Sequence, residues 1–576
     1  MGLLNSALQI GRSAILSYQG ALHTVGNNIS NAGSPDHVRL TPDLQPVQGS
    51  LINGQLQPGA GVAFTDIQRN IDEALEGRMR HAIGAQESSV AQRDALAQVE
   101  VAFDETSGAG VGTRIADFFH LFDELQNTPD DAAVRDLVVS GGSNLADSLR
   151  GLRRQLGSLG GAMDDQIAQV VTSANDAAKE IARLNGQITA DEAGRRGEAT
   201  ALRDRRDALL RQLSEYFDVT VRQQPNGGIN VYVGSEALIQ GGTSRGLTTT
   251  TESDGEFRRT TVRFADTNQA IVVRGGRIGG LIKARDEQAY GRIQRVDDLA
   301  AGIISAVNRV HADGQGLEAF REVTGAQDLL AADVPLNAST AGLETEPKTG
   351  SFYITVLDDA THTPVAHRID VTLDGTATAT TLTSLVQSIN DNVPGVTASV
   401  TPDKRLSIKA DAGSSFTFGF DGQDSRPDSS GVLAALGINT FFEGTDARDI
   451  DVNAALKASP SLIAAGSVFL SGDGTNAGRL AELDSAKLEA LGGLSTAGFY
   501  GSIANAVAVA AGDANTDVDA TQAVHSSLQA QRESISGVNL DEEAIALLKY
   551  ERSFQGAARF VSVVDQLLGE VVALIR

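Results

Sequence analysis

Both ends of the chain carry an apolar heptad seam, and these two seams limit what the chain can fold into. Near the N-terminus, apolar or small residues recur in alternating steps of four and three: Leu4, Leu8, Gly11, Ile15, Tyr18, Leu22, Val25 and Ile29. This spacing is typical of a left-handed coiled coil. Arg12 is the only charged residue before Asp36. A surface helix normally carries charges opposite its apolar stripe, so we expect this helix to be packed on most sides.

The C-terminal seam runs to the last residues of the sequence. Its members alternate in steps of three and four: Leu547, Tyr550, Phe554, Ala557, Val561, Val564, Leu568, Val571 and Ile575. Burial of each large member stabilises by about 1.5–3 kcal/mol. A helical hairpin in a globular core is the alternative explanation. Because there are two such seams, one of them nearly uncharged, we favour assembly between copies. We expect neither seam to be covered within an isolated copy.

Length and charge restrict the class of protein. The chain has 576 residues, too many for one hydrophobic core, so we expect two to four domains. A formal net charge of −26 argues against nucleic acid and against an anionic membrane surface as partners. No stretch approaches the roughly 18 apolar residues of a membrane span. The absence of cysteine excludes disulfides and thiolate metal sites.

Between the seams, the apolar pattern changes from helix to strand and back. Helical spacing predicts long helices from about 64 to 215 and again from about 286 to 311. The turn sequence Pro225-Asn226-Gly227-Gly228, between alternating segments, predicts a β-hairpin. Alternation resumes over about 348–437. We therefore predict a mainly α fold with β-rich parts (α+β), in which paired terminal coiled-coil helices accompany a long-helix body and an inserted β-rich domain.

Three domains are predicted from these changes in pattern. They are a terminal helical polymerisation domain, a helical body domain with a β-hairpin region at 217–282, and an inserted β-rich domain. Polar stretches on both sides of the insert suggest its limits. The predicted bounds are 1–60 with 530–576, 61–335 with 438–529, and 336–437.

Short motifs of catalytic or binding sites have simpler explanations. Ser244 lies in a G-x-S-x-G pattern, but a β-like segment follows it where a nucleophile elbow needs a helix, so a hairpin turn is favoured. The Gly-rich segment 107–113 lacks the lysine of a phosphate-binding loop and suits a turn between helices. Asp473 suits a turn and a helix cap better than a calcium loop. His362 and His367 have no further ligand cluster nearby. We predict no catalytic residue, no metal site and no cofactor.

The start of the chain has two small patterns of its own. It lacks a basic and then apolar segment of the kind found in a cleavable secretory signal. Gly2 and Ser6 fit the pattern for myristoylation, but the start of a helix is the favoured interpretation.

The segment 27–35, Asn-Asn-Ile-Ser-Asn-Ala-Gly-Ser-Pro, resembles the N-terminal signature of flagellar rod, hook and junction proteins. The signature residues are Asn27, Asn28, Asn31 and Pro35. The family continues with Gly-Tyr, whereas this chain has Asp36-His37. Further segments resemble the junction proteins of that family, in the same order along the chain: 108–112, 118–119, 127–130, 203–207, 306–316, 441–444, 472–476 and 536–543.

The resemblance implies a structural subunit that joins the flagellar hook to the filament and has no enzymatic activity. The implied partners are copies of the chain in a ring, the hook protein, a second junction protein (hook-associated protein 3) and an export chaperone at the C-terminal region. The implied location is the extracellular flagellum, reached through the flagellar type III apparatus. A hook protein or second junction protein is one alternative. A flagellum-borne hydrolase that uses the insert or Ser244 is another.

Overall fold

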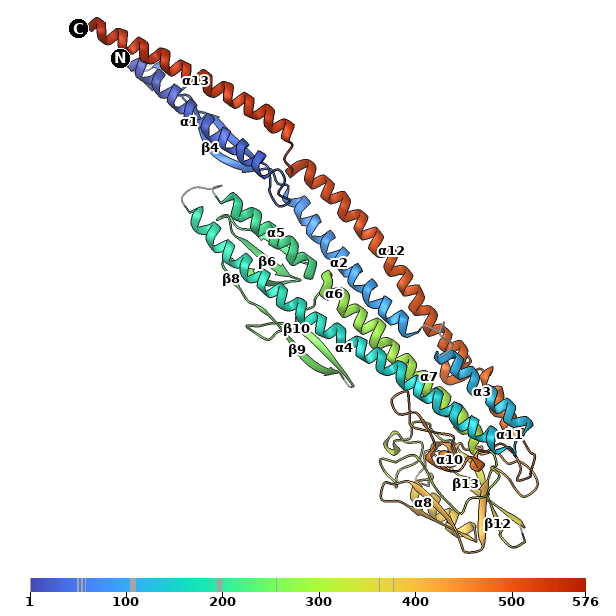
Figure 1. The fold of residues 1–576 in the computed structure, drawn as a ribbon. Helices are drawn as coiled ribbons and strands as arrows, with labels where there is room; N and C mark the ends of the chain where they lie inside the picture. The colour runs from blue at the N-terminus through green and yellow to red at the C-terminus, as the bar shows by residue number, and fades with distance from the viewer. Residues whose placement is uncertain are drawn as a thin grey trace. The chain divides into compact units, whose positions relative to one another are not determined.

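The computed structural model describes residues 2–48, 51–52, 55–56, 59–103, 110–193, 199–254, 256–361, 363–376 and 378–575. The chain forms two compact units (Figure 1). Unit 1 comprises Met1–Ala95, Gly161–Ala284 and Gly512–Arg576, and unit 2 comprises Leu96–Gly160 and Arg285–Ala511. Long helices and several small sheets make up both, which confirms the predicted α+β class.

Three long helices each contribute residues to both units: α2 (Glu73–Ala102), α4 (Ala132–Asp191) and α12 (Thr496–Ser536). The other helices of unit 1 are α1 (Gly2–Asn31), α5 (Thr200–Tyr216), α6 (Gly276–Lys283) and α13 (Leu540–Ile575). The start of α1 at Gly2 agrees with the interpretation of this end as the beginning of a helix.

The strands of unit 1 form hairpins. They are β1 (Leu40–Pro46), β2 (Leu51–Ile52), β3 (Gln55–Leu56), β4 (Val62–Arg69), β5 (Thr220–Gln223), β6 (Ile229–Val233), β7 (Glu236–Gln240), β8 (Thr243–Ser244), β9 (Leu247–Asp254) and β10 (Phe257–Phe264). The predicted hairpin is confirmed, because β5 pairs antiparallel with β6 across the Pro225–Gly228 turn. The prediction of helix from 64 is wrong at its start, since residues 62–69 form β4, paired with β1.

Phenylalanine side chains pack against one another in unit 2. The unit includes α3 (Val111–Asn127), all but the first residue of a π-helical segment (Ala284–Tyr290), α7 (Gly291–Ala312), α10 (Ala454–Ala458) and α11 (Thr475–Ala481). Helix thus resumes about ten residues earlier than predicted, already in α6. The rings of Phe118 and Phe122 of α3 lie 5.4 and 5.6 Å from that of Phe441, at centroid distances typical of packed aromatic pairs.

The β-rich part of unit 2 has two three-stranded sheets, ordered β13-β12-β16 and β11-β15-β14. Its elements are β11 (Glu322–Thr324), β12 (Gly350–Asp358), β13 (Pro364–Val371), α8 (Leu382–Asn392), β14 (Val396–Val400), β15 (Leu406–Ala410), β16 (Ser414–Phe418), α9 (Val432–Ala435), β17 (Phe442–Glu443) and β18 (Asp451–Val452). Strand β11 and buried Leu329 belong to the same sheet and core as this part, although both precede the predicted bound at 336. The three-domain division itself stays a prediction.

Two buried titratable side chains lie near the end of α7. His311 is fully buried, with Nδ1 2.8 Å from the Asn439 carbonyl oxygen and Nε2 accepting from the Ala464 N–H at 3.0 Å. These partners suit the neutral ring, and burial lowers the pKa of His311 to about 4. Burial also raises the pKa of Asp313 to about 6, although the hydrogen bond that the Asp428 N–H donates to its carboxylate acts to lower this pKa.

These two shifts predict opposite effects of pH on the stability of unit 2. Asp313 binds its proton more tightly when folded, so its contribution is lost as pH rises from about 4 through 6. His311 is favoured neutral when folded, so its contribution is lost as pH falls from about 6.5 to 4. Asp313→Asn should remove only the first effect. The variant should therefore gain about 2 kcal/mol of stability relative to wild type between pH 4 and 6.5.

The measurement is urea unfolding at a series of pH values, with hydrogen exchange of β12 and β16 reporting on unit 2. Asp370→Asn serves as the control, because Asp370 belongs to an exposed ion pair with Arg368. This variant should leave the pH dependence of stability unchanged. A stability difference between Asp313→Asn and wild type that does not change with pH would contradict the prediction.

Candidate assembly interface

The two terminal seams face each other in unit 1. Helices α1 and α13 lie side by side over much of their lengths (Figure 1). A Cβ atom placed on Gly11 would lie 2.3 Å from Val561, and the rings of Tyr18 and Tyr550 are 6.5 Å apart. Rising numbers on α1 thus meet falling numbers on α13, so the pair is antiparallel. The expectation that the seams are uncovered within one copy is wrong, because each seam covers the other.

Burial follows the predicted seam positions on both helices. On α1, Gly11 and Val25 are buried, and these seam residues are partly buried: Leu4, Leu8, Ile15, Tyr18, Leu22 and Ile29. On α13, Val564 is buried at 4 % exposure, and these residues are partly buried: Leu547, Tyr550, Phe554, Ala557, Val561, Leu568 and Val571. The side chain of Ile575 lies outside the described residues. Use of these positions between copies stays a prediction.

The hairpin of β1 and β4 covers a second side of α1, a contact that the sequence pattern did not predict. Ser17 Oγ donates a hydrogen bond to the Val62 carbonyl oxygen at 2.9 Å. The ring of Phe64 lies against Gly20, where a Cβ atom would come within 2.9 Å of it. Gly20 therefore permits close approach of the hairpin, although glycine costs an isolated helix about 1 kcal/mol relative to alanine.

Asn28 is the signature residue that connects these elements. It is fully buried, and its side-chain amide exchanges two hydrogen bonds with the backbone of Leu40, at 2.8 and 3.0 Å. Its Nδ2 also donates to Glu543 of α13 at 3.0 Å. Arg39 Nε donates to the same carboxylate at 2.8 Å. Asn28 thereby holds the end of α1, the start of β1 and the first turn of α13 together.

The other signature residues contribute less to this joint. Asn31 Nδ2 donates to the Asn27 carbonyl oxygen at 3.0 Å, one turn back on α1. Asn27 is exposed, and Pro35 is exposed in the turn that follows the helix. The signature thus supplies one buried connector, Asn28, and residues that end the helix.

Asp36 and His37, where the chain departs from the family pattern, contact helix α5. Asp36 Oδ1 accepts a hydrogen bond from Arg211 at 2.6 Å. His37 Nδ1 lies 3.5 Å from Asp204 Oδ2, and its Nε2 lies 3.4 Å from Asn28 Oδ1. The changed pair therefore keeps the turn in place through polar contacts to α5.

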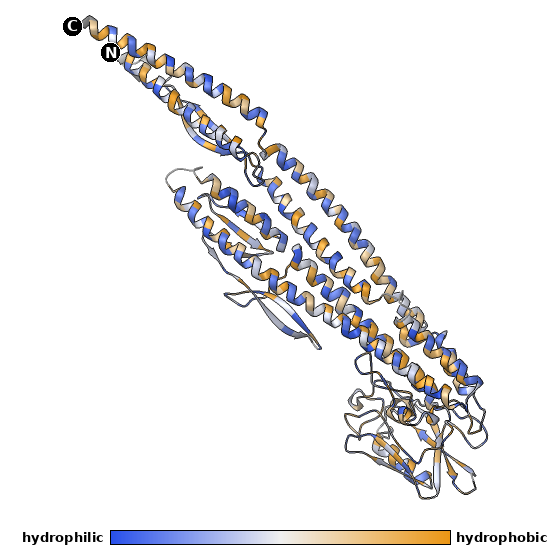
Figure 2. Cartoon of the chain, viewed as in Figure 1, coloured by the Kyte–Doolittle hydropathy of each residue, from blue (hydrophilic) through white to orange (hydrophobic). Residues whose placement is uncertain are grey.

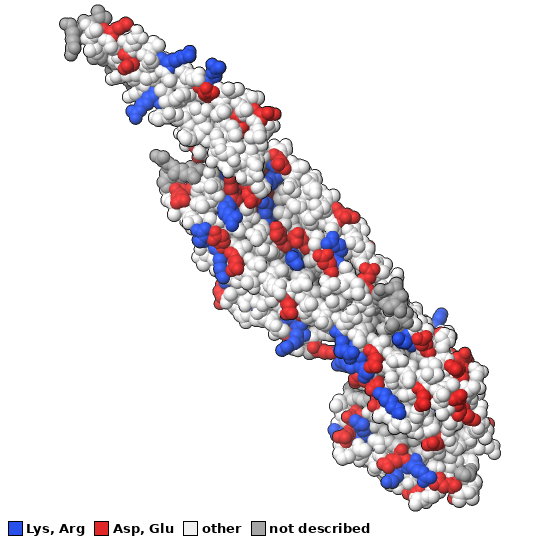
Figure 3. All heavy atoms as spheres, viewed as in Figure 1, with Lys and Arg blue, Asp and Glu red and all other residues white. Residues whose placement is uncertain are grey.

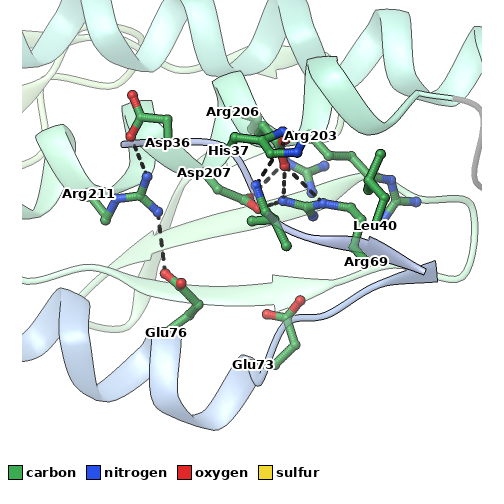
Figure 4. A network of polar contacts seen from close by, with 12 residues as sticks. Asp36, His37, Leu40, Arg69, Glu73, Glu76, Arg203, Arg206, Asp207 and Arg211 are labelled. Carbon is green, nitrogen blue, oxygen red and sulfur yellow. Dashed lines mark hydrogen bonds and ion pairs between the residues drawn. The ribbon is translucent and has the colours of Figure 1, made fainter. Parts of the chain in front are cut away.

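A half-buried ion-pair network extends from this turn (Figure 4). Arg69, at the end of β4, points toward α5 and contacts Asp204 and Asp207, each at 2.6 Å. Burial alone would lower the pKa of Arg69, but Asp207 and Asp204 together raise it. Glu76 of α2, only 3 % exposed, contacts Arg211 at 3.5 Å. The network links the turn after α1 to α2, β4 and α5.

The alternative sites do not gain support from the structure. Ser244 lies on β8, paired with β7 across a tight turn and followed by β9, as expected for a hairpin. Asp473 Oδ1 accepts from the N–H of Thr475, the first residue of α11, which agrees with the predicted turn, whereas the N-cap residue of α11 is Gly474, without a side-chain capping bond. His362 and residues 107–109 lie outside the described residues. Within the described part, no group of three or more metal-ligating side chains occurs.

None of the described helices combines the length and the apolar character that crossing a membrane requires.

Three family models match separate parts of the chain. "Flagellar hook-associated protein FlgK helical domain" matches residues 96–326. "Flagellin hook IN motif" matches residues 354–412, and "Flagellar basal body rod FlgEFG protein C-terminal" matches residues 529–574. The last match covers most of α13.

Curated relatives match from end to end. Flagellar hook-associated protein 1 of Salmonella typhimurium is 24 % identical over 98 % of this chain and 99 % of its own length. The protein of the same name from Escherichia coli is 24 % identical over 99 % of both chains, and that of Bacillus subtilis is 22 % identical over 98 % and 97 %. A solved structure, the flagellar hook junction protein FlgK from Burkholderia pseudomallei, aligns with a TM-score of 0.53 at 17 % identity, over 80 % of this chain and 100 % of that one. It shows a similar fold.

Proposed function

Since the chain belongs to the family of flagellar hook-associated protein 1, we propose that it is the structural subunit that joins the flagellar hook to the filament. The observation that carries this proposal is the match over nearly the full length of both chains. The helical domain matched at 96–326 argues against a hook protein, because it contains the 203–207 segment that resembles the junction proteins. The chain is a flagellar structural component and not an enzyme.

The terminal helices are the parts of the chain that we assign to assembly. Helix α13 keeps a partly exposed apolar seam even when α1 covers it, and α1 has almost no charge. Buried apolar area is the main source of favourable free energy in most protein association. Copies of the chain in a ring, the hook protein and a second junction protein are the proposed partners. The proposed route is export through the flagellar type III apparatus, with a chaperone on the C-terminal region until then.

Deletion of the gene tests this function. Cells without it should make hooks that carry no filament, and filament protein should accumulate in the medium, because the joint would be missing. Electron microscopy of isolated flagellar bases gives the result directly. Expression of the wild-type chain from a plasmid should restore attached filaments.

Two outcomes would contradict the proposal. Filaments that remain attached to hooks in the deletion strain would show that the chain is not the joint. Loss of the hooks themselves would indicate a rod or hook protein instead.

A further inference from the structure

Helix α1 is covered on two sides within one copy, whereas α13 is covered on one. Helix α13 and the β1–β4 hairpin both pack on α1. No element other than α1 makes extensive contacts with α13 among the described residues. Hydrophobic segments nevertheless recur along the whole of α13 (Figure 2). The uncovered apolar surface of the terminal pair is therefore concentrated on α13.

A second apolar stripe lies on α13 beside the seam. Phe560, Val563 and Leu567 are 43, 56 and 46 % exposed. Their spacing of three and then four residues places them on one face of the helix. The edge of the Phe560 ring also approaches α1, since a Cβ atom on Gly11 would lie 3.3 Å from it. The stripe thus continues the contact between α1 and α13 outward to solvent.

The charge distribution favours another copy of this chain as the partner that covers the stripe. Copies with a net charge of −26 repel one another over most of their surfaces. Helix α1 carries a single charged side chain, Arg12. Residues 544–575 balance three basic side chains against three acidic ones: Lys549, Arg552, Arg559, Glu551, Asp565 and Glu570. Figure 3 shows wide uncharged areas between the few charged side chains over these helices. Like chains therefore approach each other here with little charge repulsion.

The outer face of α1 is the complementary surface. A ring requires two different faces of the same chain to meet, because a head-to-tail contact closes it. Exposed residues of α1 recur in steps of four and three on the face away from α13 and the hairpin: Asn5, Gln9, Arg12, Leu16, Gln19 and His23. Leu16 is the one large apolar residue among them, at 56 % exposure.

We propose that the stripe of Phe560, Val563 and Leu567 on one copy packs on the outer face of α1, around Leu16, of the next copy. The seam then holds each subunit's own helices together, and the stripe holds neighbouring subunits together. This inference rests on the proposed function, since it assigns the contact between subunits of the ring.

Val563→Asp tests the stripe without disturbing the seam. The charge should lower the fraction of hooks with attached filaments at least tenfold, while hydrogen exchange of α1 and α13 in the purified monomer stays as in wild type. Ser562→Asp is the matched control, because Ser562 is exposed on another face of α13. It should support wild-type filament attachment. Normal attachment with Val563→Asp would overturn the inference.

Crosslinking identifies the partner surface. Because the chain has no cysteine, only the introduced cysteines of this chain can react. One copy carries Leu16→Cys and a second copy carries Val563→Cys, so that only contacts between copies produce a mixed dimer. Both are expressed together, and isolated hook–filament structures are treated with a short bis-maleimide. A mixed dimer is expected, and Ser562→Cys with Leu16→Cys should give none.

The outcomes separate the inference from the proposed function. If wild type restores filaments but Val563→Cys crosslinks only to another flagellar protein, the junction function stands and the inference falls. If wild type itself fails to restore filaments, the proposed function falls. A mixed dimer of the assembled chain would still support the contact in that case.

Discussion

Replacing Arg69 with leucine should lower the free energy of unfolding of unit 1 by about 3–5 kcal/mol. Arg69 is 8 % exposed and contacts Asp204 and Asp207, which are 12 and 14 % exposed. Without the guanidinium, Asp204 would lose its arginine partner, and Asp207 would keep only the longer 3.8 Å contact with Arg206 in a half-buried site. The loss of a partner from a buried ion pair costs more than the pair itself contributes, because the remaining charge is desolvated.

Urea unfolding with hydrogen exchange of α5 and β6 as the reporter measures this loss. Arg183→Leu is the control, since Arg183 pairs with Glu180 at 2.7 Å but both side chains are exposed. Its effect should be much smaller because solvent screens exposed pairs. Neutralising Asp204 and Asp207 to asparagine in the Arg69→Leu background should restore part of the stability. Equal losses of stability in Arg69→Leu and Arg183→Leu would show that the ion-pair network around Arg69 does not stabilise unit 1.

The elements predicted best are those whose signal is local. The turn Pro225–Gly228 specifies a hairpin through its own residues, and the structure has one there. The helical spacing that predicts a helix from about 286 to 311 is likewise local, and the structure forms α7 (Gly291–Ala312) there. The pairing of β1 with β4 was missed because it depends on contacts between distant residues, and neither strand is buried along a full face. The three-residue strand β11 is too short to show a period of two.

The same distinction applies to the candidate assembly interface: its apolar faces could be predicted from local spacing, whereas the partners of those faces could not. A heptad repeat tells which face of a helix is apolar, and the predicted faces of α1 and α13 are the ones that meet. It does not tell what covers that face, so the pairing within one copy was not foreseen. Asn28 was singled out by resemblance, but its role depends on Leu40 and Glu543, which folding brings to it. Nothing in the sequence around Arg69 indicates that its side chain is buried and not exposed to solvent.

Replacing Val561, Val564 and Leu568 with aspartate should abolish incorporation at the hook tip. Val564 is 4 % exposed and the other two are partly buried against α1. Each substitution removes up to about 1.5–3 kcal/mol of apolar burial, and a carboxylate at the Val564 position adds several kcal/mol of desolvation. A single helix pair cannot recover this sum, since isolated helices are marginal in water. Helix α1 should then separate from α13.

The test uses purified protein added to hooks that lack the junction, because an export chaperone gripping α13 would confound an experiment in cells. Aspartates at the exposed positions Gln555, Ser562 and Gln566 make a control with the same added charge. Hydrogen exchange should become fast in α1 and α13 of the seam variant and stay slow in α4 and β12. Normal binding by the seam variant would show that the pair is not needed for assembly. Loss of binding together with fast exchange throughout α4 and β12 would instead make the seam part of the general core. A stripe variant that keeps α1 and α13 protected but does not bind would separate the contact that builds the subunit from the one that joins subunits.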